Sequence, residues 1–328
     1  MKTVAAIALA LLALTGLLLV AQQTPQKQQP VEEMPTIKVD VDLVSVLFSV
    51  RDKRGALVNT MTKDDFQVFE DGKEQQVRQF SKESDLPITI GLLVDVSGSQ
   101  RNLIDVERRA SVQFFRQVLR QKDMAFVISF GSEAELLQDY TNSVNLLSSA
   151  LNGLKPDSAV GGLHPGPVPT LGQARGTILF DTVYLAANDK LKGEVGRKAM
   201  VLITDGIDHG SRVKIREAMD AAHRADAIIY SVEYLDYSAY RGGFGMSSGS
   251  GDLRRISEET GGRMYRVDRR NSLDAIYDEL QQELRSQYSI SYSPANSARD
   301  GGFRKLDIRV KGKDLKVQAR KGYFATRR

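Results

Sequence analysis

The stretch PITIGLLVDVSGS, residues 87–99, contains a nearly continuous apolar run that ends in a cluster of Asp and Ser. Such a run is typical of a strand that is buried on both faces of a parallel sheet, because a half-exposed strand alternates apolar and polar residues. Residues 102–120 then have the spacing of a helix, and strand-like and helix-like segments alternate as far as residue 286. This pattern predicts an α/β domain over 86–286 with a doubly wound, mostly parallel sheet.

The other elements of this middle region follow from the same two periodicities. In the first helix, the expected apolar face consists of Leu103, Val106, Ala110, Phe114 or Phe115, and Val118. We expect further strands at 124–130, 135–140, 198–205, 227–235 and 263–267, and further helices at 143–152, 178–191, 213–224, 253–260 and 272–285.

The two flanks have strand patterns alone. Residues 38–50 alternate with one shift of phase at Leu43–Val44, which predicts a β-bulge, and Asp71-Gly72 lies between two strand-like runs as in a tight hairpin. The far end alternates over 288–292, 306–310 and 315–319. We therefore expect segments 37–85 and 287–328 to pair into one small β-domain that flanks the α/β domain.

The N-terminus is expected to be a targeting segment. Residues 1–21 combine a short charged start with an apolar run from Val4 to Ala21, which is typical of a secretory signal peptide, and residues 22–36 form a Gln- and Pro-rich linker. An uncleaved membrane anchor is the alternative, since the run is close to the minimum length of a span. Either interpretation predicts an exported protein, periplasmic or extracellular.

Charge is distributed unevenly along the chain. The 328 residues carry a formal net charge of +4, but residues 299–328 contain eleven Lys or Arg and three Asp. A roughly neutral body with a basic tail argues against a nucleic-acid-binding protein. Because charged and apolar residues alternate in the tail, most of its basic side chains are expected on the solvated face of strands. Contact with an envelope or membrane surface is the alternative.

Composition excludes several kinds of site. The absence of Cys rules out disulfides, thiolate metal sites and cysteine nucleophiles, and three His without an HExxH pattern argue against a histidine-ligated zinc. Neither GxGxxG after the first strand nor GxxxxGK[ST] occurs, so a nucleotide phosphate loop of those kinds is not expected.

Oxygen-bearing side chains follow the strands at one edge of the expected sheet. Asp95, Ser97 and Ser99 end the first strand, Asp205 ends the strand VLITDG, and Thr177 follows a glycine ahead of another helix. The carboxyl ends of parallel strands meet at the same edge, where open α/β sheets bind ligands. Two carboxylates and three hydroxyls suit Mg²⁺ or Mn²⁺. A turn with a helix cap is the structural alternative.

These segments carry a resemblance to a known family. DVSGS, GT and TDG occur in the order found in the metal-ion-dependent adhesion site of von Willebrand factor type A (VWFA) domains, and about 200 residues resemble such a domain. The whole layout, with a tail that ends ARKGYFA, is similar to the VWFA-related domain proteins of acidobacterial-type genomes. The resemblance implies that Ser97, Ser99 and Thr177 are direct or nearly direct ligands, that Asp95 and Asp205 act mainly through water, and that a partner protein supplies an Asp or Glu carboxylate.

The expected function is therefore an exported, metal-ion-dependent protein-binding module and not an enzyme. A metal-dependent hydrolase is one alternative, for which His209 is the nearest candidate base; an envelope scaffold with a vestigial metal site is another. Two loops at the same edge, 155–176 and 236–252, are candidates for partner selection, although an ordinary surface loop explains their composition equally well. The candidate contacts in the second loop are Tyr237, Tyr240, Arg241, Phe244 and Met246.

Overall fold

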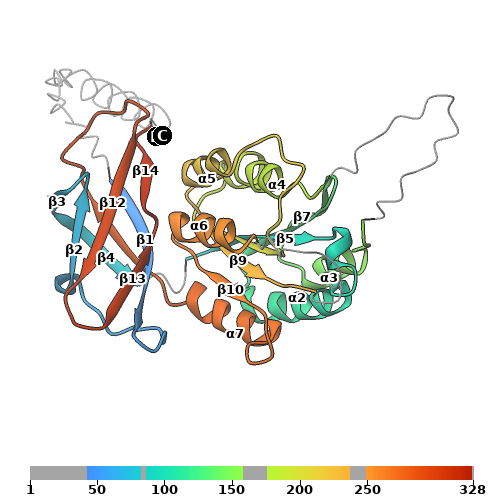
Figure 1. Cartoon of the computed structure of the whole chain (residues 1–328). Coiled ribbons are helices and arrows are strands. Elements are labelled where there is room, and N and C mark those ends of the chain that lie inside the picture. The colour runs from blue at the N-terminus through green and yellow to red at the C-terminus, as the bar shows by residue number, and fades with distance from the viewer. Residues whose placement is uncertain (1–42, 83–85, 158–175, 237–248, 327–328) are drawn as a thin grey trace, which may run out of the picture. The chain divides into compact units, whose positions relative to one another are not determined.

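A computed structural model of the chain describes residues 43–82, 86–157, 176–236 and 249–326 (Figure 1). The expected signal segment, the linker, most of the two loops and the five candidate loop contacts Tyr237, Tyr240, Arg241, Phe244 and Met246 lie outside these ranges. Within them, every helix is too short or too polar to cross a membrane.

The middle of the chain contains a six-stranded sheet in the order β10-β9-β8-β5-β6-β7. Its strands are β5 (Ile88–Asp95), β6 (Met124–Phe130), β7 (Ala134–Thr141), β8 (Arg197–Thr204), β9 (Ala227–Glu233) and β10 (Met264–Arg266). All neighbours are parallel except β7, which pairs with β6 in the antiparallel sense. The predicted doubly wound, mostly parallel sheet is confirmed.

Helices cover both faces of this sheet (Figure 1). They are α2 (Ile104–Val118), α3 (Val144–Asn152), α4 (Leu179–Leu185), α5 (Ile215–Arg224), α6 (Ser250–Thr260) and α7 (Leu273–Leu284). Helices α2, α3 and α7 share one apolar core with the sheet, and α4, α5 and α6 share the other. The single helix predicted over 178–191 is α-helical only as far as Leu185, and a π-helical segment, Ala186–Leu191, continues it.

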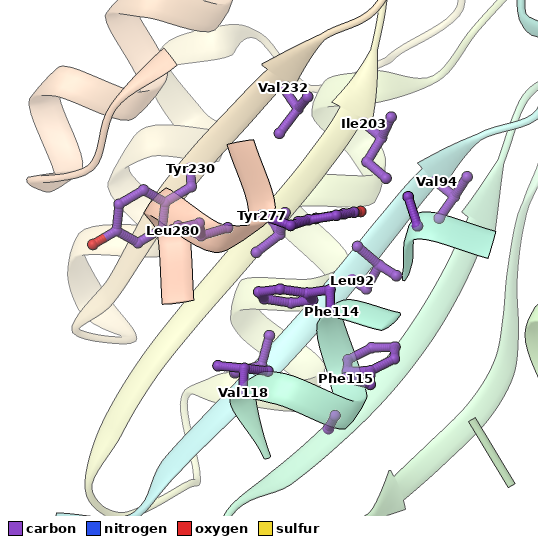
Figure 2. Close-up of a cluster of buried hydrophobic side chains, with 14 of the residues drawn as sticks. Leu92, Val94, Phe114, Phe115, Val118, Ile203, Tyr230, Val232, Tyr277 and Leu280 are labelled. Atoms are coloured by element: carbon purple, nitrogen blue, oxygen red, sulfur yellow. The ribbon is translucent and has the colours of Figure 1, made fainter. Parts of the chain in front are cut away.

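The alternation of β5 between the two cores explains its continuous apolar sequence. Leu92 and Val94 lie in the core under α2 and α7, whereas Leu93 lies in the opposite one. Figure 2 shows the first of these cores, in which Phe114 of α2 stacks on Tyr277 of α7 with ring centroids 4.5 Å apart. Every residue of β5 is therefore buried.

The predicted apolar face of the first helix is buried at Ala110, Phe114 and Val118 but not at its start. Leu103 and Val106 are only partly buried, and the buried face begins instead at Ile104 and Glu107 before it continues through Phe114. Thus a glutamate occupies a core-facing position one turn into the helix.

The flanks pair into one small β-domain, as predicted, and it consists of two antiparallel sheets. Their strands are β1 (Val44–Asp52), β2 (Phe66–Glu70), β3 (Lys73–Gln75), β4 (Val77–Lys82), β11 (Tyr288–Tyr292), β12 (Phe303–Val310), β13 (Leu315–Ala319) and β14 (Gly322–Phe324). One sheet has the order β13-β1-β11-β4 and the other β14-β12-β2-β3, so each sheet contains strands from both flanks. A shared apolar core joins the two sheets into a sandwich.

Two local predictions for the flanks have opposite outcomes. The hairpin is confirmed, because Asp71 and Gly72 have φ values of 47° and 80° between β2 and β3. The bulge at Leu43–Val44 is absent from the described residues, in which β1 pairs with β11 in unbroken register from Val44 onwards. The shift of phase falls at the first residue of the strand, so no extra residue enters the ladder.

Three arginines of the basic tail contact other residues of the chain. Arg304 and Arg320 are buried and form ion pairs with Asp300 and Asp226, so they do not lie on a solvated strand face. Arg309 is exposed and lies 4.1 Å from the ring centroid of Phe69.

The buried His223 makes the stability of the fold depend on pH. This α5 side chain is 5% exposed and lies edge-on to Phe303; burial, with the nearby charge of Arg320, lowers its pKa to about 4. Between about pH 6.5 and 4, the unfolded chain therefore binds a proton at His223 that the folded chain does not bind. The contribution of His223 to the free energy of unfolding is complete above pH 6.5 and decreases as the pH is lowered. We expect a loss of about 2–3 kcal/mol from this group between pH 7.5 and 4.5.

Urea unfolding of the wild type and of His223→Gln at both pH values measures this effect. The variant should lose less stability than the wild type on acidification, and His209→Gln, at an exposed position, is the matched control. Equal losses in the wild type and His223→Gln would contradict the assignment.

Candidate metal centre

Asp95 is the last residue of β5 and is completely buried. Its Oδ1 accepts a hydrogen bond from the backbone N–H of Ser97 at 2.9 Å, and its Oδ2 accepts one from the Thr204 hydroxyl at 2.6 Å. Thr204 ends β8, the neighbouring parallel strand. The carboxylate thus fixes the turn after β5 and ties together the ends of two strands.

Ser97, Ser99 and Asp205 continue the same hydrogen-bond chain. The Ser97 and Ser99 hydroxyl oxygens are 3.0 Å apart, and the Ser99 hydroxyl donates to Asp205 Oδ2 at 2.6 Å. Asp205 is 2% exposed, and its Oδ1 accepts from the backbone N–H of Ile207 at 3.0 Å. The structure therefore brings together four of the five predicted residues.

Thr177 lies at the same edge but is held through its backbone. Its carbonyl accepts hydrogen bonds from the N–H groups of His209 and Gly210, each at 3.1 Å, and the next N–H, of Ile178, donates to the Gly131 carbonyl just after β6. Among the described residues, no hydrogen bond joins the Thr177 hydroxyl to the other four predicted residues.

The glycine before Thr177 has a steric reason. A Cβ at Gly176 would lie 2.3 Å from the Cβ of His209, so a larger residue would separate the two loops. His209 itself is exposed, and its contacts with this segment are made by its backbone and Cβ. The backbone of His209 therefore positions Thr177 within the loop.

Negative charge is concentrated at this edge. Burial and, next, the nearby charge of Asp205 raise the pKa of Asp95 to about 7, although hydrogen bonds from Ser97 and Thr204 act in the opposite direction. The negative charge of Asp205 therefore disfavours the ionised form of Asp95. A cation between them would favour the ionised form of both.

Sequence patterns did not reveal two further polar residues near this edge. Glu107 of α2 is 0% exposed, and neither of its carboxylate oxygens has a hydrogen-bond partner among the described residues. Gln100 is also completely buried; its amide donates to the Tyr234 carbonyl at 3.1 Å, and its Oε1 has no partner there. Gln100 follows the DVSGS segment directly and Glu107 lies in the first turn of the next helix, but a polar residue early in a helix normally indicates a solvated position.

The donor set fits a hard divalent cation. All candidate ligand atoms are oxygens, the carboxylates of Asp95 and Asp205 belong to one hydrogen-bond chain, and buried acceptor oxygens nearby have no partner. The described residues contain no group of three or more His, Cys, Asp or Glu that would hold a metal by themselves. Any ion here would accordingly depend on hydroxyl ligands as well as carboxylates.

No family model and no curated protein matches the sequence, whereas solved structures do. The BatB protein of Bacteroides thetaiotaomicron is 17% identical over 60% of this chain and 97% of its own, with a TM-score of 0.44. The vWF domain of the type V pili tip protein Mfa5 from Porphyromonas gingivalis is 10% identical over 61% and 95%, with a TM-score of 0.45. Proximal thread matrix protein 1 from the mussel byssus, with a zinc-occupied MIDAS motif, is 14% identical over 66% and 50%, with a TM-score of 0.48.

The topology of the large sheet places the candidate residues at its ligand edge. Numbered in chain order, the strands of the large sheet are arranged 3-2-1-4-5-6, which is the doubly wound arrangement, and the ligand edge of such a sheet lies beyond the strand ends. The DVSGS and TDG segments end adjacent strands at that edge, and the GT segment is bonded to the TDG loop. The α/β part of this chain has a doubly wound fold with these segments at its ligand edge, and it is similar to the solved structures that contain a vWF domain or a MIDAS motif.

Proposed function

We propose that this chain is an exported binding module that engages a protein partner through a divalent cation, Mg²⁺ or Mn²⁺. The observation that supports this most strongly is the hydrogen-bond chain Asp95–Ser97–Ser99–Asp205 at the ligand edge of the sheet. Export is supported by the apolar run from Val4 to Ala21 in the sequence.

The chemistry of these residues explains why a partner carboxylate would bind. Ser97, Ser99 and Thr177 would offer neutral oxygens to the ion, and Asp95 and Asp205 would act mainly through water. Mg²⁺ keeps several waters and prefers octahedral geometry, so it retains positive charge and an exchangeable position. The bound ion would supply a Lewis-acidic position for an Asp or Glu side chain of the partner.

Binding agrees with the site better than hydrolysis. A hydrolase would require a base beside the ion. The candidate base, His209, is exposed and is joined to the site by backbone contacts to Thr177. Ester and phosphodiester assays of the wild type and of Asp205→Ala separate the two functions, since a hydrolase would lose a measurable activity in the variant.

We expect Mg²⁺ or Mn²⁺ to raise the melting temperature of the protein. An ion that binds only the folded state stabilises it by about 2.7 kcal/mol at a hundred times its Kd. For a domain of this size, that corresponds to roughly 5–10 °C. The double variant Ser97→Ala/Ser99→Ala should lose this increment, as measured by a thermal melt with the metal and with a chelator.

The matched control is Ser45→Ala/Ser291→Ala, which removes a second pair of hydrogen-bonded hydroxyls, 2.8 Å apart in the sandwich. This control should still respond to the metal. The ligand assignment is wrong if Ser97→Ala/Ser99→Ala responds as the wild type does. The same pair of variants serves as bait in a pull-down from envelope extract with Mg²⁺, in which chelator and the Ser97/Ser99 variant should release the same partner.

A further inference from the structure

Glu107 occupies a position that carboxylates rarely occupy. It lies on the core-facing side of α2, on the stripe that continues through Ser111, Phe114 and Val118. Figure 2 shows the apolar surroundings of Phe114 and Val118 under the sheet. Glutamate is seldom completely buried unless it is paired, yet both oxygens of Glu107 lack a hydrogen-bond partner in the described part of the chain.

The charges that act on Glu107 link it to the candidate metal centre. Burial raises its pKa well above the usual value, and the charges of Asp95 and Asp205 raise it further. Helix α2 begins at Ile104, five residues after Ser99, so Glu107 lies in the first turn after the loop that carries both serines. The charges of two carboxylates at strand ends thus act on a third carboxyl group in the helix.

A second unpartnered acceptor lies in the same region. The Gln100 amide donates a hydrogen bond to the carbonyl of Tyr234. Burial of the Tyr234 hydroxyl raises its pKa, and the charge of Glu107 is the second cause of this increase. Both Gln100 and Glu107 are therefore near Tyr234. Three buried acceptor oxygens, one from Gln100 and two from Glu107, have no donor among the described residues. A polar site of this kind is the usual place for ordered water or a positive charge.

We propose that Glu107 is a positioning residue that adds negative charge to the cation site without contacting the ion. Ordered water would lie between its carboxylate and the ion. The inference rests on the proposed cation site. It assigns to that site a third carboxylate, which the motif residues do not include. The bound ion would provide a positive charge near the buried Glu107 carboxylate, which has no partner among the described residues. Part of the affinity for the divalent ion would therefore arise from a side chain that does not contact it.

The test is the affinity of the full chain for Mn²⁺ alone. It is measured from the decrease of the free-ion signal in electron paramagnetic resonance as the protein binds the ion. Glu107→Gln keeps the size of the side chain and removes its charge, and we expect Mn²⁺ binding to weaken roughly 10- to 100-fold. The metal-free melting temperature should not fall, because a neutral amide replaces an unpaired buried acid. Glu107→Met should weaken Mn²⁺ binding in the same way, so the result does not depend on how glutamine packs.

The control is Asp105→Asn, which removes a carboxylate from the same helical turn on its exposed side, where Asp105 pairs with Arg108 at 2.8 Å. Its Kd for Mn²⁺ should stay within about two-fold of the wild type, since exposed charges are screened. If the wild type binds Mn²⁺ and the two Glu107 variants bind it equally well, Glu107 has a structural role only and the inference is wrong. If the wild type itself fails to bind Mn²⁺, the proposed cation site and this inference both fail.

Discussion

Arg51→Ala is expected to lower the free energy of unfolding by about 3–5 kcal/mol, because it leaves a buried carboxylate without its cation. Arg51 of β1 forms ion pairs with Glu283, which is 0% exposed, and with Glu279 at 2.8 Å. Both glutamates belong to α7, so this arginine joins the sandwich to the last helix of the α/β domain.

Glu283 is the acceptor of several other hydrogen bonds. Its donors are Ser49 at 3.1 Å, Gln318 at 2.9 Å, Tyr265 at 3.2 Å and Tyr230 at 3.4 Å. Ser49 and Gln318 come from sandwich strands, whereas the two tyrosines come from the large sheet. These hydrogen bonds hold the carboxylate in place, so it cannot turn to water when Arg51 is lost.

Urea denaturation measures the effect, with Lys53→Ala as the matched control. Lys53 pairs with Asp314 at 3.3 Å, and both side chains are more than half exposed, so its loss should cost less than about 1 kcal/mol. Adding Glu283→Gln to Arg51→Ala should recover part of the stability, because the unpaired charge is then gone. A stability of Arg51→Ala within about 1 kcal/mol of the wild type would show that the Glu283 charge is compensated in another way.

The alternation of residue types was sufficient to predict most of the fold. Residues 87–95 identified a doubly buried strand, and Asp71-Gly72 identified the hairpin, because both signals are local. The sandwich pairing followed from the strand patterns at the two ends. The division of 178–191 into an α-helix and a π-helical segment did not follow, since a change of helical hydrogen bonding at Ala186 leaves the apolar spacing almost unchanged.

The candidate site divides in the same way. Asp95, Ser97, Ser99 and Asp205 are predictable because each follows a recognisable strand, and parallel strands end at one edge. Glu107 was not predictable, because the buried face of the helix begins at Ile104 and Glu107 and not at Leu103 and Val106. Glu283 was missed as well, since its burial depends on Arg51, which is 232 residues away in the chain.

Asp123→Ala is expected to have a comparably large effect on stability, about 3–5 kcal/mol, at the other end of β5. Asp123 is 2% exposed and pairs with Arg285, which directly follows α7. The carboxylate also accepts hydrogen bonds from the backbone N–H of Ile88 at 3.0 Å and of Arg120 at 2.8 Å. Its removal takes the counter-charge from the Arg285 guanidinium, which keeps only its hydrogen bond to the Val118 carbonyl among those described, and leaves two backbone N–H groups without this acceptor.

The loss should be concentrated at the end of α7, because Asp123 connects this helix to the first residue of β5. Hydrogen exchange over 280–288 should therefore be faster in Asp123→Ala than in the wild type, and urea unfolding should give the loss of stability. Asp278→Ala, on the exposed side of α7, is the control and should change neither measurement appreciably. Faster exchange spread evenly over the chain would contradict a local role. Exchange confined to 280–288 would mean that a buried ion pair at the amino end of β5 fixes α7, at the edge of the sheet opposite to Asp95.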